Sequence, residues 1–197
     1  FRALLAATNF TYRAQQVDGF TAGISFANGF LNMTNAVVRR PEGKASVDAL
    51  GFDTRTRRLY LTNAVSRLEP TAVAKAIGPK IASSLEPYRF LEPPLASVNG
   101  WVQTGPGRNP ADLRFVIDGG ALRFSKFNSR DIDGEILWRG QTLTLTNIVA
   151  EFYGGELRGN LVSRFKEDRS ADLAFHLDTK QTELSDFMSD ILGKKSG

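Results

Sequence analysis

Hydrophobic and polar residues alternate with a period of two along most of the chain. Within 132–138, Ile132, Ile136 and Trp138 fall on one phase, and within 143–146 leucine alternates with threonine. In 173–178 large apolar residues alternate with Ala, His and Asp. This period indicates strands that each have one apolar face. Short turn-forming stretches separate the runs, so the sequence predicts an antiparallel meander.

Two stretches instead follow the helical period. Apolar residues recur every fourth position from Val73 to Leu85, around a Gly-Pro pair, which predicts a kinked helix or two short helices within 70–86. A second apolar stripe predicts an amphipathic helix over 183–192, ended by Gly193, and we expect Phe187, Met188 and Ile191 to cap one end of the apolar surface.

An internal repeat organises these elements. The pattern L-x-x-T-N-x-V begins at Leu31, at Leu59 and at Leu143, and the first and third occurrences are 112 residues apart. The segment 17–19 (VDG) similarly recurs 115 residues later as 132–134 (IDG). Ordered matches at nearly constant spacing indicate a duplication of a long unit. In the first copy, strands are predicted near 10–17, 20–27, 30–39, 44–53 and 57–66.

The fold class that follows is mainly β. We expect an elongated, strongly twisted antiparallel sheet, either a groove or a partly open barrel, built from two tandem meander copies. Residues 1–123 hold the first copy with the helix at 70–86 and connecting strands, and residues 124–197 hold the second copy with the helix at 183–192. No clean linker separates them, so one continuous sheet is predicted.

The composition excludes several classes of functional site. The 197 residues include 25 Lys and Arg, 21 Asp and Glu, one His and no Cys. These counts exclude a disulfide scaffold, thiol catalysis, cysteine metal sites and multi-histidine zinc sites. No stretch approaches the roughly 18–20 apolar residues of a membrane-spanning helix. Because the sequence begins with Phe1, we interpret it as a piece of a longer protein.

The remaining chemical motifs have simpler structural interpretations. Residues 131–135 (DIDGE) resemble part of a calcium loop but lack the spacing of an EF-hand. His176 has no nucleophile motif to serve, so a solvent-facing strand histidine is expected. Arginines beside aromatic residues, as in 88–90 (YRF), occur without an RNA-binding signature. We therefore expect no enzyme activity, no cofactor, no metal and no nucleic-acid partner.

The second copy resembles the C-terminal repeat region of the AsmA-like family of bacterial envelope proteins. Residues 153–159 (YGGELRG) match a Y-G-G-x-L-x-G hallmark, and 183–186 (ELSD) match the start of the following helix. In the first copy, 40–43 (RPEG) stands where Tyr-Gly-Gly would be. The family is related in architecture to TamB and to eukaryotic bridge-like lipid transfer proteins.

The resemblance implies a location, partners and an activity. It implies a periplasmic part of a cell-envelope protein, anchored in the inner membrane through chain not present here. Adjacent repeats of the same chain and phospholipid acyl chains would be its partners. The activity would be shielding of acyl chains in a hydrophobic β-groove, for phospholipid transport between the inner and outer membranes and outer-membrane biogenesis.

Two functional hypotheses stay open, because one apolar face per strand fits both. The first is the open lipid groove, and the second is a structural or protein-interaction β-sandwich module with a closed core. In either case we expect one set of residues in the second copy to line the apolar interior, since each lies on the apolar phase of its strand. These residues are Phe124, Ile132, Ile136, Trp138, Leu143, Leu145, Leu157, Leu161, Leu173, Phe175 and Leu177.

Overall fold

The computed structural model describes residues 1–77, 82, 85–86, 88–104, 110–124, 127–166, 170–183, 185 and 188–189. In these residues the chain forms one antiparallel sheet, one helix of two turns, and further helical positions at Ala82, Ser185 and 188–189. The first seven strands are β1 (Arg2–Tyr12), β2 (Gln15–Ala27), β3 (Phe30–Arg40), β4 (Gly43–Asp53), β5 (Arg58–Ser66), β6 (Tyr88–Phe90) and β7 (Leu95–Gln103). The others are β8 (Ala111–Asp118), β9 (Leu122–Phe124), β10 (Phe127–Arg139), β11 (Thr142–Phe152), β12 (Gly155–Phe165) and β13 (Ala171–Lys180).

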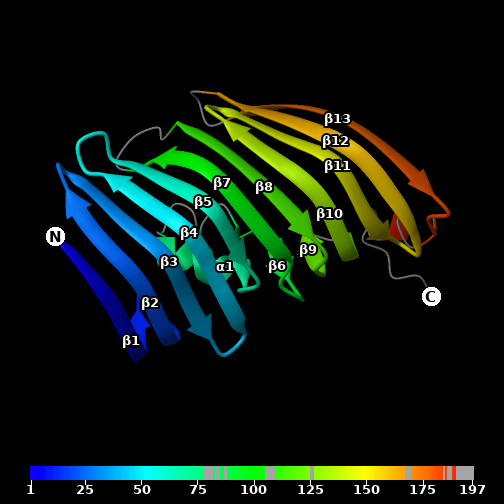
Figure 1. Cartoon of the computed structure of the whole chain (residues 1–197). Helices are drawn as coiled ribbons and strands as arrows, with labels where there is room; N and C mark the ends of the chain where they lie inside the picture. Colours follow the sequence, from blue (N-terminus) through cyan, green and yellow to red (C-terminus); the bar gives the residue numbers. More distant parts are fainter. Residues whose placement is uncertain are drawn as a thin grey trace.

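The strands lie almost in chain order. The main path of the sheet is β1-β2-β3-β4-β5-β7-β8-β10-β11-β12-β13, and the short strands β6 and β9 pair with each other beside β10. Figure 1 shows the strands side by side in one curved layer from β1 to β13, with α1 (Pro70–Ile77) behind β4 and β5. The predicted mainly-β, elongated antiparallel sheet is confirmed, and the sheet is not closed into a barrel.

Two-residue turns join several neighbouring strands. Arg13 and Ala14 between β1 and β2, and Tyr153 and Gly154 between β11 and β12, all have positive φ. This backbone is that of a type I′ hairpin turn. The predicted strand at 10–17 is therefore wrong, because a turn interrupts it. Arg-Ala lacks the Asn-Gly or Asp-Gly signature by which such turns are recognised in sequence.

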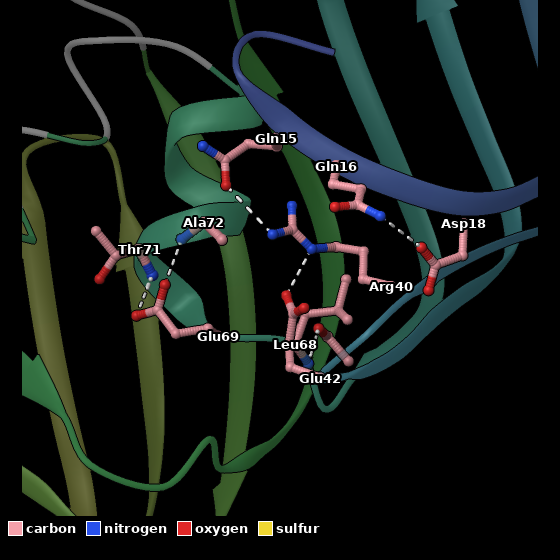
Figure 2. Close-up of polar contacts among 10 residues, drawn as sticks. Gln15, Gln16, Asp18, Arg40, Glu42, Leu68, Glu69, Thr71 and Ala72 are labelled. Carbon is pink, nitrogen blue, oxygen red and sulfur yellow. Dashed lines mark hydrogen bonds and ion pairs between the residues drawn. The ribbon is translucent and has the colours of Figure 1, made fainter. Parts of the chain in front are cut away.

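The helix α1 begins where the sequence predicts. Pro70 occupies its first turn, and the carboxylate of Glu69 accepts hydrogen bonds from the backbone N–H groups of Thr71 (3.0 Å) and Ala72 (2.7 Å). Figure 2 shows this cap at the helix start. α1 ends at Ile77, and Ala82 is again helical, whereas 85–86 form a turn. Residues 78–81, 83–84 and 87 lie outside the described part, so the predicted kink or second short helix stays a prediction.

The second predicted helix is only partly covered. Ser185, Met188 and Ser189 are helical, and Met188 is 42% exposed. The other positions expected to cap the apolar surface, Phe187 and Ile191, lie outside the described residues.

A small core lies where α1 meets the sheet. The helix contacts β2, and small or medium apolar residues there are almost fully buried: Val17, Ala22, Ala36, Leu68, Ala72 and Ala74. Arg40 closes this corner, with Nε 2.5 Å from Glu42 Oε1 and Nη2 donating to Gln15 Oε1 at 3.3 Å (Figure 2). Its side chain is only 13% exposed.

Candidate functional site

Residues paired across neighbouring strands project from the same face of a sheet. One row of such pairs crosses nine strands, from β3 to β13, and every member is apolar. We call it the nine-strand row: Ala36, Val47, Ala64, Val98, Phe115, Ile136, Leu145, Leu161 and Phe175.

A second row crosses eleven strands, from β1 to β13, and Ser163 is its only polar member. This eleven-strand row is Ala3, Ile24, Met33, Leu50, Leu61, Gly100, Leu113, Trp138, Leu143, Ser163 and Leu173. In β7, β8 and β10 to β13 the two rows are two residues apart along the strand, so they share one face. We call this the apolar face.

In β5 the same face is maintained by a β-bulge. Leu61 pairs with Gly100, and Ala64 pairs with Val98, so three steps along β5 match two steps along β7. Val98 and Gly100 are on one face, and therefore Leu61 and Ala64 are too, despite their odd spacing. The extra residue is Asn63, which has φ 49°. Without the bulge, Leu61 and Ala64 would project from opposite faces of β5, and the two rows would no longer share one face.

The repeated Thr-Asn pair of the sequence marks these bulges. Asn35 and Asn147 occupy the equivalent position in their copies of the motif, with φ 49° and 54°. Asparagine tolerates this left-handed conformation better than most side chains do. The side-chain oxygen of an asparagine on the next strand accepts a hydrogen bond from the backbone N–H of the bulge residue. Asn99 accepts from Asn63 at 2.7 Å, and Asn160 accepts from Asn147 at 3.0 Å. The sequence shows this motif as a repeat, but its role in phasing was missed.

The opposite face is charged and hydrogen-bonded. Ion pairs join Arg114 to Glu135 (2.9 Å), Arg158 to Glu156 (2.5 Å) and Arg139 to Asp112 (3.4 Å). The Arg158 guanidinium lowers the pKa of the Glu156 carboxyl by hydrogen bonding, and the same contact raises the pKa of Arg158. The sheet is thus amphipathic, with one apolar and one polar face.

The residues expected to line the apolar interior are brought together. Ile136 pairs with Leu145, Leu145 with Leu161, and Leu161 with Phe175. Trp138 similarly pairs with Leu143. Leu173 pairs with Ser163 at the end of the eleven-strand row. The other expected residues flank the two rows: Ile132 and Leu157 both pair with Ala150, and Leu177 pairs with Gly159. Phe124 belongs to β9, and its side chain lies outside the described part.

This face is open toward β13. The side of β13 that continues the apolar face carries Leu173, Phe175 and Leu177, which are 62%, 68% and 43% exposed. His176, between them in sequence, is exposed beside Asp178 at 3.2 Å. Among the described residues, no large side chain is fully buried. Exposed large apolar side chains that gather on one face are a feature of binding surfaces.

The glycines of residues 153–159 have structural roles. A Cβ added to Gly155 would lie 2.2 Å from the Lys180 carbonyl oxygen, and one added to Gly159 would lie 2.2 Å from that of His176. Gly154 has φ 76° in the hairpin turn. These glycines therefore allow β12 and β13 to approach closely, and they contribute no chemical group to the apolar face.

The calcium-like segment also has a structural role. The Asp133 carboxylate accepts a hydrogen bond from the backbone N–H of Gly119 at 3.1 Å, across the β8–β10 pair. Within the part of the chain that the structure describes, His, Cys, Asp and Glu form no group of three or more able to hold a metal ion. In that same part, none of the helical segments has the length and hydrophobicity to span a membrane.

Comparison of the chain with protein-family models, curated proteins and solved structures finds no match.

Proposed function

We propose that this chain shields lipid acyl chains on its apolar face, as a non-catalytic part of a bacterial envelope protein that moves phospholipid between the inner and outer membranes. The supporting observation is the pair of rows on a sheet that is not closed, apolar at every position except Ser163, in which Phe175 is 68% exposed. Such a surface needs no catalytic group, since burial stabilises an acyl chain by about 0.8 kcal/mol for each methylene.

The sheet offers a broad surface to a ligand rather than an enclosed cavity. Strands such as β12, with 11 residues, are about 36 Å long. The described residues form a single layer instead of the two packed sheets of a β-sandwich, which favours the groove over the closed-core alternative. A groove of this kind binds by shape and area, and so suits acyl chains of different lengths.

The proposed setting comes from the resemblance of residues 153–159 and 183–186 to the AsmA-like family. In this proposal the chain lies in the periplasm, and the parent protein is anchored in the inner membrane. β1 and β13 are the two ends of the described sheet path. Adjacent repeats of the same chain would pair with these edges and lengthen the groove.

Native mass spectrometry and lipid extraction of the purified protein test the proposal. We expect co-purifying phospholipid in the wild type and its loss in Trp138→Asp, with the fold retained. Trp138 is half-buried, and its Nε1–H donates to the Gly140 carbonyl (3.1 Å). We therefore expect an aspartate there to reach water at small cost. Thr144→Asp places the same charge on the opposite face and should keep the lipid.

Two results would reject the groove. The first is a wild type without bound lipid together with an unfolded Trp138→Asp variant, since an unpaired carboxylate is strongly destabilising only in a closed core. The second is stable binding of a protein over the apolar face, which would support the interaction module instead.

A further inference from the structure

Three arginines cluster at the turn between β4 and β5. Arg55, Arg57 and Arg58 lie within the six residues 53–58, whose only acidic residue is Asp53. The Asp53 carboxylate is already used by the turn, because Oδ1 accepts the backbone N–H groups of Arg55 (2.9 Å) and Thr56 (3.4 Å). The turn therefore carries an excess of positive charge.

The charges of these arginines are not neutralised within the described residues, where none of the three forms an ion pair. Arg55 and Arg57 are exposed, and Arg57 is held at the turn by its carbonyl, which accepts the backbone N–H of Thr104 at 2.8 Å. The Arg58 Nε is buried without a hydrogen-bond partner in that same part of the chain. Arg55 Nη2 donates to the Asn28 carbonyl at 3.0 Å, so it is the exposed guanidinium groups of Arg55 and Arg57 that an anion from outside can approach.

Aromatic side chains adjoin the turn. The Arg58 guanidinium lies 4.3 Å from the centre of the Trp101 ring, which is a cation–π contact. Trp101 pairs with Tyr60, and the Tyr60 ring is 6.1 Å from that of Phe30. A Cβ added to Gly51 would come 2.6 Å from the Phe30 ring, so this ring lies over Gly51.

This cluster is on the face opposite the apolar face. Tyr60 lies between Leu59 and Leu61 in β5, and Leu61 belongs to the eleven-strand row. Successive side chains of a strand point to opposite faces, so Tyr60 and its partner Trp101 project from the polar face. The surface is therefore separate from the one proposed to hold acyl chains.

We propose that this basic–aromatic patch, formed by Phe30, Arg55, Arg57, Arg58, Tyr60 and Trp101, docks the protein on the surface of a bilayer that contains anionic phospholipid. Arginine supplies charge complementary to the lipid phosphates. Tyrosine and tryptophan, with an apolar ring and one polar group, favour the membrane–water interface. The patch is confined to one turn and its neighbours, and so lacks the extended basic stripe of a nucleic-acid site.

The fluorescence of Trp101 provides a direct test. The chain has two tryptophans, so the Trp138→Phe variant leaves Trp101 as the only one. We expect its emission to shift to shorter wavelength with phosphatidylcholine vesicles that contain about one third phosphatidylglycerol, and quenching by brominated lipid. Pure phosphatidylcholine vesicles should give neither effect, and added salt should weaken the binding.

Paired arginine variants test the site. Arg55→Gln with Arg57→Gln should weaken vesicle binding about thirtyfold, because each surface arginine near an anionic membrane contributes about a fivefold effect. Arg114→Gln with Arg158→Gln removes equal charge from a distant part of the polar face and should change it less than threefold. Circular dichroism verifies folding in both pairs.

Several outcomes would overturn the docking proposal. These are equal weakening by both arginine pairs, equal binding to pure phosphatidylcholine, unchanged Trp101 emission, or binding of a single-stranded oligonucleotide in place of vesicles. The proposal does not depend on the acyl-chain groove, since the two surfaces are on opposite faces. Lipid co-purification measured on the same variants separates the two, because Arg55→Gln with Arg57→Gln should retain it.

Discussion

Replacing Phe175 by aspartate places a charge at the β13 end of the nine-strand row. A fully buried phenylalanine side chain contributes about 1.5–3 kcal/mol to folding. Phe175 is 68% exposed, so roughly a third of that contribution, about 0.5–1 kcal/mol, is present. We therefore expect Phe175→Asp to lower the free energy of unfolding by no more than about 1 kcal/mol.

The effect on a bound acyl chain should be larger. A chain that lies over Phe175 and must avoid the carboxylate loses contact for about three methylenes, roughly 2.4 kcal/mol at ~0.8 kcal/mol each. This corresponds to lipid binding weakened about fiftyfold. Titration with a fluorescent phospholipid measures this ratio, and urea unfolding measures the stability of the same sample.

The neighbouring residue supplies the control. Ala174 is exposed on the opposite face of β13, paired with Val162, so Ala174→Asp adds the same charge without touching the apolar face. Equal lipid loss in both variants would show that charge alone, rather than position, decides binding. A loss of more than about 3 kcal/mol of stability in Phe175→Asp would mean that this face is a covered core.

Three further predictions concern the sheet itself. Asn63→Ala should lower the free energy of unfolding by about 2 kcal/mol, from the left-handed φ and the lost 2.9 Å hydrogen bond to Asp48, as measured by urea unfolding. Gly159→Ala should destabilise by about 1–3 kcal/mol, because its Cβ would lie 2.2 Å from a β13 carbonyl oxygen, and hydrogen exchange should locate the effect in β13. NMR titration of the Glu156 carboxyl should give a pKa below the ordinary value of 4.5, and Arg158→Gln should return this pKa toward 4.5. Since the folded-state pKa is lowered, the stabilisation is present at neutral pH and is lost as pH falls below about 4.5.

Each of these has its own check. Asn63→Gly should retain more stability than the alanine variant, and the reverse order would argue against backbone strain as the cause. Gly19 has no atom closer than 4.0 Å to an added Cβ, so Gly19→Ala should cost less than Gly159→Ala. A Glu156 pKa at or above 4.5 would mean that the ion pair with Arg158 does not persist in solution.

The sequence alone was sufficient for most of the strands and for their apolar phase away from the bulges. Side chains alternate along a strand, so Ile136 and Trp138 could be assigned to one face from their spacing. The same rule placed His176 opposite Phe175. The I′ turn at Arg13 and Ala14 was not predictable, because these residues lack the usual turn chemistry.

The bulges required the tertiary structure. Continuing the period of two from Leu145 would put Val149 on the apolar face, whereas the bulge at Asn147 puts Ile148 there, opposite Gly159. The Thr-Asn pair was visible as a repeat, but its left-handed backbone depends on pairing with the next strand. The local pattern shows which residues alternate on each side of a bulge. Pairing with the neighbouring strand determines which face of the sheet the residues beyond the bulge project from.

Whether the apolar face is open or covered was also decided only by the tertiary structure. Alternation along each strand is the same in a closed sandwich and in an open sheet, since it reports only that one side of the strand avoids water. Whether another layer covers the apolar face depends on residues far away in the chain. Here the described strands all join one layer, which leaves Leu173 and Phe175 largely exposed, because no second layer packs on them among the described residues.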